Sequence, residues 1–359
     1  MPVSPANRLP LNIVNPGRRI DSVCASPDEP PKLVVIVDTE EEFDWSKPHS
    51  RDQISVGHIK HHHRTQSIFE RYGVRPTYVV DFPVASQEAG YRVLREWLED
   101  GKCQIGAHLH PWVNPPFDEP LSARNSFPGN LPAELERKKL AVLTDTVEAN
   151  FGIRPTVYRA GRYGIGANTG GILEALGYEV DSSVVPYTNF APDAGPDFMD
   201  FDASPFWFGP TNSVLEIPLT VEWHGRLRRY GADYQRYLMS KPGLKLHLPG
   251  ILARLHLSER IRLTPEGTTL AELKRLVDTM LETGHRHFVF SFHSPSVAPG
   301  NTPYVRSDEE LRRFLTLIDE FCAYFFGERG GEATTPVDLR RIWERHRPCA
   351  KVKAGDAIG

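Results

Sequence analysis

Short runs of apolar residues recur along the chain and alternate with longer segments whose apolar residues have helical spacing. The first run, LVVIV at 33–37, is continuous and mostly β-branched, which is typical of a strand buried on both faces of a parallel sheet. In residues 269–284, Thr269 and Glu272 have the spacing of a capping box and Gly284 ends the helical pattern. Further runs predict strands at 77–80, 104–107, 156–158, the stretch through Val180, 214–217 and 288–292.

This alternation predicts βα units that build a parallel sheet. Six or seven such units in about 300 residues fit one closed or nearly closed barrel better than two domains. We therefore predict an α/β fold with a single (β/α)-barrel, a distorted seven-stranded parallel barrel, over residues 31–330. Residues 224–266 are basic, interrupt the alternation and are expected to form an inserted helical cap. Residues 1–30 are expected to form an irregular leader, and residues 331–359 a C-terminal tail with one short helix around 339–345.

Composition narrows the range of partners. The 359 residues include 42 Lys and Arg against 46 Asp and Glu, and the net charge of −4 offers no general attraction to nucleic acid. No apolar run approaches the roughly 20 residues of a transmembrane helix, and the first thirty residues lack the apolar core of a signal peptide. We expect a cytoplasmic protein with no nucleic-acid partner and no transmembrane segment. The basic cap is expected to be solvated, with contact to phosphates or to the inner membrane face as the alternative.

Polar residues follow six of the predicted strands directly. In a parallel barrel the carboxyl ends of the strands meet at one mouth, where the active sites of this architecture lie. We expect the six residues to converge there. They are Asp38, Asp81, His108, Arg159, Asp181 and His293.

The segment AHLHPW carries two histidines at strand spacing. Side chains alternate along a strand, so His108 and His110 would point to the same face, about 6–7 Å apart at their bases, and could chelate one cation. The alternative is that one histidine packs under Trp112 while the other is solvated. A carboxylate at the same mouth would favour the metal site.

The segment VDTEEEFDW supplies such a carboxylate. Asp38 ends a continuous apolar strand, where burial is costly without a cation or base as partner. Glu40 lies on the same side if the strand continues. The alternative is that the whole run is a solvated acidic loop.

Two other patterns compete with this interpretation. The histidines between 58 and 63 could form a metal-binding tract, although a solvent-exposed helix face is the expectation.

The glycine-rich YRAGRYGIGANTGG, with Arg159 and Arg162, is similar to a lengthened dinucleotide fingerprint. That motif belongs in the first βα unit, however, and this one follows the fourth strand. G-x-S-x-G is absent, which removes the basis for a nucleophile-elbow hydrolase.

Together these segments resemble the polysaccharide deacetylase superfamily, also called carbohydrate esterase family 4 or NodB-homology proteins. Within it, they resemble the branch found with lipopolysaccharide biosynthesis genes. The resemblance covers roughly residues 31–326 and is carried by VDTEEEFDW, RPTYVVDFPVA, IGAHLHPW, YRAGRYG, GYEVDSS and FSFHS. It implies a barrel that holds a divalent metal, zinc first and iron, cobalt or nickel as alternatives.

The resemblance also implies roles for individual residues. Asp38 matches the catalytic base, and His108 and His110 match the metal-binding histidines. The family's Asp-Asp pair reads Asp38-Thr39 here, so the carboxylate ligand is either Glu40 or Asp38 itself. The family's histidines are usually four apart, whereas these are two apart, so the loop geometry must differ.

For the remaining roles, His293 matches the general acid and Asp181 corresponds to the acidic residue that tunes it. Arg159, or alternatively Arg162, matches the arginine that orients the base. Substrate contacts are expected from four residues near the strand ends. They are Asp81, Trp112, Arg162 and Tyr163.

The implied function is metal-dependent removal of acetyl groups from an N-acetylated sugar in polysaccharide or lipopolysaccharide biosynthesis. A cytoplasmic location would favour a nucleotide-linked or lipid-linked sugar over finished polymer. A non-catalytic carbohydrate-binding relative of the same fold is the first alternative, because two motifs are altered. A dinucleotide-dependent enzyme is the second.

Overall fold

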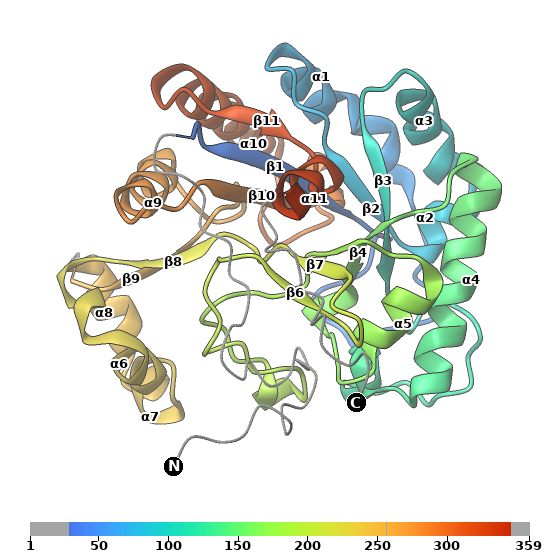
Figure 1. Ribbon diagram of the computed structural model, residues 1–359, viewed down its shortest axis with the longest axis horizontal. Coiled ribbons are helices and arrows are strands. Elements are labelled where there is room, and N and C mark those ends of the chain that lie inside the picture. Colours follow the sequence, from blue (N-terminus) through green and yellow to red (C-terminus); the bar gives the residue numbers. More distant parts are fainter. Residues whose placement is uncertain (1–28, 256, 346–359) are drawn as a thin grey trace, which may run out of the picture.

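The computed structural model describes residues 29–255 and 257–345. The leader expected at 1–30 and the last part of the tail therefore lie almost wholly outside the described residues. Within the described chain, helices surround a strongly curled sheet (Figure 1).

The central sheet has nine strands, and all seven strands predicted from apolar runs are present in it as parallel neighbours. Strand β6 extends the sheet beyond β7 as an antiparallel edge. The curled sheet confirms the predicted (β/α)-barrel class. Its strands, in spatial order, are β10 (His287–His293), β1 (Lys32–Thr39), β2 (Thr77–Val80), β3 (Gln104–Leu109), β4 (Val157–Ala160), β5 (Val180–Asp181), β7 (Val214–Glu216) and β6 (Phe206–Phe208).

A separate hairpin fills the gap between the two ends of this sheet. It consists of β8 (Val221–His224) and β9 (Glu259–Arg262), which pair antiparallel. At its base, Leu263 N donates to Thr220 O at 2.9 Å, and Ser291 N of β10 donates to Leu263 O at 3.2 Å. These hydrogen bonds join the hairpin to β10 and narrow the opening of the barrel.

Helices pack on the outer face of the sheet and bury its outward side chains, such as Val35, Tyr78 and Phe290. The predicted capping box starts α9, and Gly152, in the left-handed conformation at φ 75°, ends α4. The helices are α1 (His63–Arg71), α2 (Phe82–Ser86), α3 (Glu88–Glu99), α4 (Ala133–Phe151), α5 (Thr169–Leu176), α9 (Leu270–Glu282) and α10 (Asp308–Cys322). Short 3-10 or π turns are η2 (Gly57–His61), η3 (Arg124–Ser126), η4 (Pro128–Asn130), η5 (Gly161–Tyr163), η6 (Ala191–Asp193), η8 (Ser294–Val297) and η9 (Ala323–Glu328).

The segment expected to be a tail is part of the barrel. Strand β11 (Glu332–Thr334) pairs with the first half of β1, and α11 (Pro336–Arg345) follows it. Leu339 and Trp343 of α11 pack with the inward-facing Val34 and Ile36 of β1. The predicted short helix around 339–345 is therefore real, but it closes the amino end of the barrel because its apolar stripe matches the barrel interior.

The basic insert is helical, in agreement with the prediction of an inserted cap, although it spans fewer residues. It lies between β8 and β9 and extends to one side of the barrel (Figure 1). Residues 263–266, assigned to the cap from the sequence, instead lie at the mouth of the barrel. Among the described residues, no helix has both the length and the apolarity to cross a membrane. The insert comprises η7 (Arg226–Tyr230), α6 (Gly231–Leu238), α7 (Lys241–Lys245) and α8 (Leu248–Arg254).

Candidate active site

The register of the sheet brings the predicted strand-end residues together in two neighbouring pairs. Asp38 of β1 is the register partner of His293 of β10, and His108 of β3 is the partner of Arg159 of β4. Because Val34 and Ile36 face the barrel interior, the period-two alternation of β1 turns Asp38 inward as well. The mouth of the barrel is therefore lined by these four side chains.

Arg159 holds the carboxylate of Asp38. Its Nη1 donates to Asp38 Oδ1 at 2.5 Å, while Nε and Nη2 donate to the carbonyl and hydroxyl of Ser182 at 2.7 and 2.9 Å. Burial alone would raise the pKa of Asp38, but the Arg159 charge, with smaller contributions from His108 and His293, lowers it to about 2. Asp38 is therefore anionic at neutral pH.

Arg162, the alternative partner of Asp38, points elsewhere. Its Nη1 donates to Ser126 Oγ at 2.6 Å, and its guanidinium lies 4.1 Å from the ring centroid of Phe127. The arginine that contacts Asp38 is thus Arg159.

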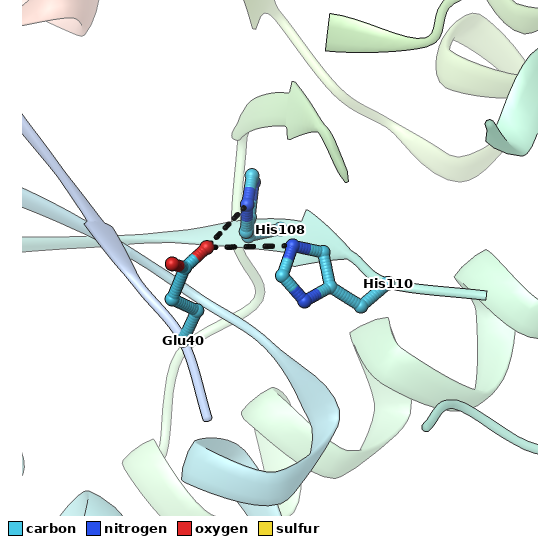
Figure 2. A group of neighbouring side chains, drawn as sticks. All are labelled: Glu40, His108 and His110. Atoms are coloured by element: carbon cyan, nitrogen blue, oxygen red, sulfur yellow. Dashed lines mark ion pairs between the residues drawn. The ribbon is translucent and has the colours of Figure 1, made fainter. Parts of the chain in front are cut away.

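Glu40, His108 and His110 form a compact, buried group (Figure 2). Glu40 Oε2 lies 3.7 Å from Nε2 of His108 and 3.5 Å from Nε2 of His110. One ligand atom from each of the three side chains lies within 4.8 Å of the others. Of the two carboxylates that the sequence offered as a possible ligand, Glu40 is therefore the one that lies beside both histidines.

The other ring nitrogens reveal how these two histidines are protonated. Nδ1 of His108 faces the carbonyl of Arg159 at 3.0 Å, and Nδ1 of His110 faces Glu41 Oε2 at 2.8 Å. Both partners accept hydrogen bonds, so each Nδ1 carries a proton and each Nε2 presents a lone pair. Burial, reinforced by the neighbouring His110, lowers the pKa of His108 to about 3, and burial lowers that of His110 to about 4.

Two lone pairs and a carboxylate oxygen thus face one another, and this arrangement fits a divalent cation. Two ligands ~2.0–2.1 Å from a tetrahedral ion are roughly 3.3–3.4 Å apart, close to the measured 3.5 and 3.7 Å. Glu40 Oε1 is buried without a hydrogen-bond partner. Burial and neighbouring carboxylates raise the pKa of Glu40 well above its usual value, so an anion here needs a positive charge.

A second layer of side chains supports this group. Glu41 also accepts a hydrogen bond from Nε1 of Trp112 at 2.7 Å, and its backbone N donates to Asp81 Oδ2 at 2.7 Å. Asp81 Oδ1 caps α2 by accepting from Val84 N at 2.8 Å. The alternative group of Glu41, Asp81 and His110 is a poorer ion site, because these hydrogen bonds already use its ligand atoms.

Two expected substrate contacts are therefore corrected. Trp112 and Asp81 are 2 % and 0 % exposed, and their polar atoms are bound to Glu41 and to α2. Trp112 stacks on the ring of His110 at 4.2 Å between centroids. Both residues support His110, directly or through Glu41, and are covered from solvent.

His293 is oriented by a carboxylate that the sequence analysis did not identify. Its Nδ1 lies 2.8 Å from Glu266 Oε2, and its backbone N donates to Glu266 Oε1 at 3.1 Å. The free Nε2 lies 3.9 Å from Asp38 Oδ2. Glu266 follows β9 in the segment that had been assigned to the cap, so strand-end reasoning did not find it.

Asp181, the residue expected to tune His293, lies beneath the site instead. Its Oδ1 accepts from Ser183 Oγ at 2.5 Å, and that hydroxyl in turn accepts from Ala160 N at 2.8 Å. Burial raises the pKa of Asp181 to about 6 beside the equally buried Glu216. The short strand β5 ends too deep in the barrel for this side chain to reach the mouth, so Asp181 supports β4.

The side chain of Tyr163 lies beside Asp38. Its hydroxyl lies 3.4 Å from Asp38 Oδ2 and accepts a hydrogen bond from Arg262. Two further aromatic side chains, which the sequence analysis did not identify, lie next to one another beside this site. Trp45 packs edge-on to the His293 ring at 4.9 Å and to Tyr304 at 5.9 Å between centroids, and the two are 36 % and 40 % exposed.

The expected solvent exposure of the 58–63 histidines is wrong for two of them. His58 and His62 are buried because η2 packs under η8, which follows His293. Nδ1 of His58 lies 3.2 Å from Glu42 Oε1, and its Nε2 accepts from Ser294 Oγ at 2.7 Å. Ser294 Oγ in turn accepts from Glu40 N at 3.1 Å, so His58 helps to position the Glu40 backbone.

The glycine turn after β4 has no room for a pyrophosphate. A Cβ at Gly166 would lie 2.4 Å from Gly129 O, and one at Gly164 would lie 2.8 Å from the Phe127 side chain. Gly129 N donates to Gly164 O at 2.7 Å. These glycines allow the 127–130 turn to approach closely, and this contact disfavours the dinucleotide interpretation.

The fold is that of polysaccharide deacetylases. Among solved structures, a putative polysaccharide deacetylase from Mycobacterium smegmatis is 16 % identical with a TM-score of 0.55, covering 92 % of this chain and 96 % of its own. A probable polysaccharide deacetylase from Pseudomonas aeruginosa PAO1 is 16 % identical with a TM-score of 0.51, covering 88 % and 92 %. Puue allantoinase is also 16 % identical with a TM-score of 0.51, covering 95 % and 99 %.

No protein-family model matches the sequence, and no curated protein sequence matches it. The fold that the sequence resemblance implied is confirmed by these solved structures. The link to lipopolysaccharide biosynthesis stays a prediction.

Proposed function

We propose that the protein is a metal-dependent hydrolase that removes the acetyl group from an N-acetylated sugar in polysaccharide or lipopolysaccharide biosynthesis. One observation carries this proposal: three groups meet at one mouth of the barrel. They are the Glu40, His108 and His110 ligand group, the Asp38–Arg159 pair and the His293–Glu266 pair. The fold shared with polysaccharide deacetylase structures supports the same reaction class.

Glu40, His108 and His110 would hold the ion and leave its remaining positions open. When bound, a divalent ion acidifies a water molecule and polarises the acetyl carbonyl. Zinc fits two imidazoles and one carboxylate, and iron, cobalt or nickel fit the same ligand types.

Asp38 would accept the proton of the attacking water. Arg159 occupies Oδ1, so Oδ2 is the oxygen that faces His293 and the hydroxyl of Tyr163. With a pKa of about 2, Asp38 is ionised whenever the enzyme works at neutral pH. So low a pKa suits a proton acceptor only for water that is already acidified.

His293 would protonate the departing nitrogen through Nε2. Glu266 fixes Nδ1 and the ring orientation, so Nε2 is the nitrogen that faces the reacting centre. The two proton-transfer atoms, His293 Nε2 and Asp38 Oδ2, are 3.9 Å apart, so both can reach one reacting centre. Trp45, which packs against His293, and its neighbour Tyr304 offer partly exposed ring faces against which a sugar ring can lie.

Metal analysis together with acetate release tests the proposal. We expect purified protein to bind about one ion per chain and to release acetate from at least one N-acetylated sugar in a panel. The double variant His108→Ala/His110→Ala should lose both properties. The matched control His61→Ala/His63→Ala also removes two histidines two positions apart, and it should keep both.

Unchanged metal content in the His108→Ala/His110→Ala protein would refute the ligand assignment. A metal-loaded wild type that releases no acetate from any substrate would instead favour the non-catalytic, carbohydrate-binding alternative. A second candidate function is hydrolysis of an amide that is not an N-acetyl group, which the similarity to Puue allantoinase supports. Metal-loaded protein that hydrolyses such an amide and releases no acetate would favour this candidate. Allantoin therefore belongs in the panel. A cytoplasmic location, contact with the inner membrane face, and a nucleotide- or lipid-linked sugar remain predictions.

A further inference from the structure

A pocket of about 230 Å³ adjoins the candidate active site. It shares three residues with the site: Glu266, which orients His293, Tyr304, which packs against Trp45, and Arg262, which donates to Tyr163. It is smaller than the about 300–1,000 Å³ of sites that enclose a whole organic ligand, so it suits one substituent of a substrate.

Two arginines of β9 dominate this pocket. Arg260 and Arg262 share one face of the strand because side chains alternate, while Ile261 between them is buried in the core. Arg260 Nη1 donates to Thr188 Oγ1 at 2.6 Å, and Arg262 donates to the hydroxyls of Tyr163 and Ser291. Arg262 Nε is buried without a hydrogen-bond partner. Within the described chain, neither arginine forms an ion pair with a carboxylate.

The carboxylates that line the same pocket are engaged elsewhere. Glu259 pairs with Arg275 at 2.9 Å, and Glu272 accepts from Thr269 N at 2.6 Å in the capping box of α9. Glu266 is bound to His293 and to Ser296. None of them is hydrogen-bonded to either pocket arginine.

Arg260 is the less compensated of the two cations. Burial, followed by the neighbouring charge of Arg262, lowers the pKa of Arg260 to about 10. Arg262, by contrast, lies close enough to Asp38 and Glu266 for both to favour its charged form. Arg260 is half-buried and has no anionic partner among the described residues, and an oxyanion is the ligand that matches the planar set of donors of a guanidinium.

We propose that the Arg260–Arg262 pocket binds a phosphate group carried by the substrate, next to the acetamido group held at the metal site. The protein would then act on a phosphorylated sugar rather than on a neutral oligosaccharide. This inference rests on the proposed function for the reacting centre, while the phosphate site itself can be tested by binding alone.

The first test compares substrates. N-acetylglucosamine 1-phosphate and UDP-N-acetylglucosamine carry the two sources of phosphate, a monoester and a nucleotide diphosphate. The reference is neutral N,N′-diacetylchitobiose, called chitobiose below. We expect wild type to prefer one phosphorylated sugar. In the Arg260→Gln variant, we expect the KM for that sugar to rise about 10- to 100-fold while the KM for chitobiose stays the same, because one charge-assisted contact is lost. The kcat should change little.

Matched variants separate charge from folding. Arg260→Lys keeps a positive charge and should recover part of the lost affinity. Arg236→Gln removes an exposed arginine of α6 outside the pocket and should leave both KM values unchanged. Thermal unfolding of each variant reports whether the pocket variants are folded.

The second test does not need catalysis. We expect calorimetry to show pyrophosphate binding to the metal-loaded wild type and a 10-fold or greater loss of affinity in Arg260→Gln. Arg260-dependent binding without acetate release would refute the proposed reaction and keep the phosphate site. Deacetylation with equal KM for neutral and phosphorylated sugars in wild type and Arg260→Gln would overturn the phosphate site and keep the reaction. Pyrophosphate binding that does not depend on Arg260 would also overturn it.

Discussion

Two pairs of buried histidines lie near the mouth of the barrel, and three consecutive glutamates contact them. Glu40 and Glu41 face the pair at 108 and 110, whereas Glu42 contacts His58 of the pair at 58 and 62. The ring centroids are 4.6 Å apart in the first pair and 5.6 Å apart in the second. Burial and spacing are thus similar in the two pairs.

The pairs differ in where their ring nitrogens point. In the first pair both Nε2 atoms converge on one carboxylate oxygen. In the second, His58 uses both nitrogens in hydrogen bonds to Glu42 and Ser294, and His62 packs edge-on to Tyr78 at 5.5 Å between centroids. Among the described residues, no group of ligand atoms close enough for an ion includes His58 or His62. Converging lone pairs, rather than burial, distinguish the proposed ligand pair from the second pair.

Removing one histidine from each pair should give the largest contrast. We expect His110→Ala to lower kcat/KM for acetate release by at least about 10³-fold, because Lewis-acid stabilisation contributes several kcal/mol to the transition state. His62→Ala should keep one bound ion and lose about 1–3 kcal/mol of stability, as for other buried side chains. Metal analysis, kinetics and urea unfolding measure these effects. Loss of the metal in His62→Ala would contradict the distinction between the two histidine pairs.

The glutamates sharpen the comparison. Glu40→Gln should weaken metal binding by more than about 100-fold, because it removes a ligand and not merely a supporting hydrogen bond. Glu42→Gln is the matched control, since it changes the carboxylate of the other pair and should leave metal affinity within a few-fold of wild type. Competition with a chelator of known affinity measures both variants, and equal losses would exclude Glu40 as a ligand.

A smaller effect is expected at Glu41, which contacts His110 through Nδ1. We expect Glu41→Gln to weaken metal binding by about 10- to 100-fold, as is typical when the partner of a ligand histidine is lost. Trp112→Phe removes the other hydrogen bond to Glu41 and should have a weaker effect in the same direction. An effect of Glu41→Gln as large as that of Glu40→Gln would move the ion toward Asp81.

The smallest effect is expected from low pH, which lowers the stability of the protein through the buried His62. Burial, followed by the charge of His58, lowers the pKa of His62 well below its usual value, so the unfolded chain binds this proton more readily. Its contribution to stability is complete above about pH 6.5 and is lost as the pH falls. We expect wild type to lose up to about 2 kcal/mol relative to His62→Leu between pH 7 and pH 5, measured by urea unfolding. Parallel pH profiles for the two proteins would contradict this.

The sequence predicted the strands and the residues at their ends, because continuous apolar runs mark strands that are buried on both faces and the polar residues that follow them mark the strand ends. Asp38, His108, Arg159 and His293 are brought together by strand register alone. Glu266 could not be found in this way, since it follows β9 of the β8–β9 hairpin, and β9 carries no apolar run. A pattern that marks strand ends does not mark residues that reach the mouth from a hairpin.

Other residues were misassigned because periodicity says nothing about which partners consume a polar atom. Trp112 and Asp81 lie near the mouth as expected, yet Glu41 and α2 already use their hydrogen-bonding atoms. The amphipathic pattern of α11 shows that one face is buried, but not that this face fills the end of the barrel. Tertiary packing determines both outcomes.

The pairing of β11 with β1 has a consequence for how the chain is made. Lys32 and Glu332, partners in this pairing, are separated by 300 positions. At roughly 5–20 residues per second, a ribosome needs about 15–60 s to synthesise the chain between them. During that time the apolar β1 lacks part of its sheet partner and the plug of α11. The nascent barrel thus exposes an aggregation-prone edge until translation is nearly complete, which makes it a natural client for chaperones that bind emerging chains.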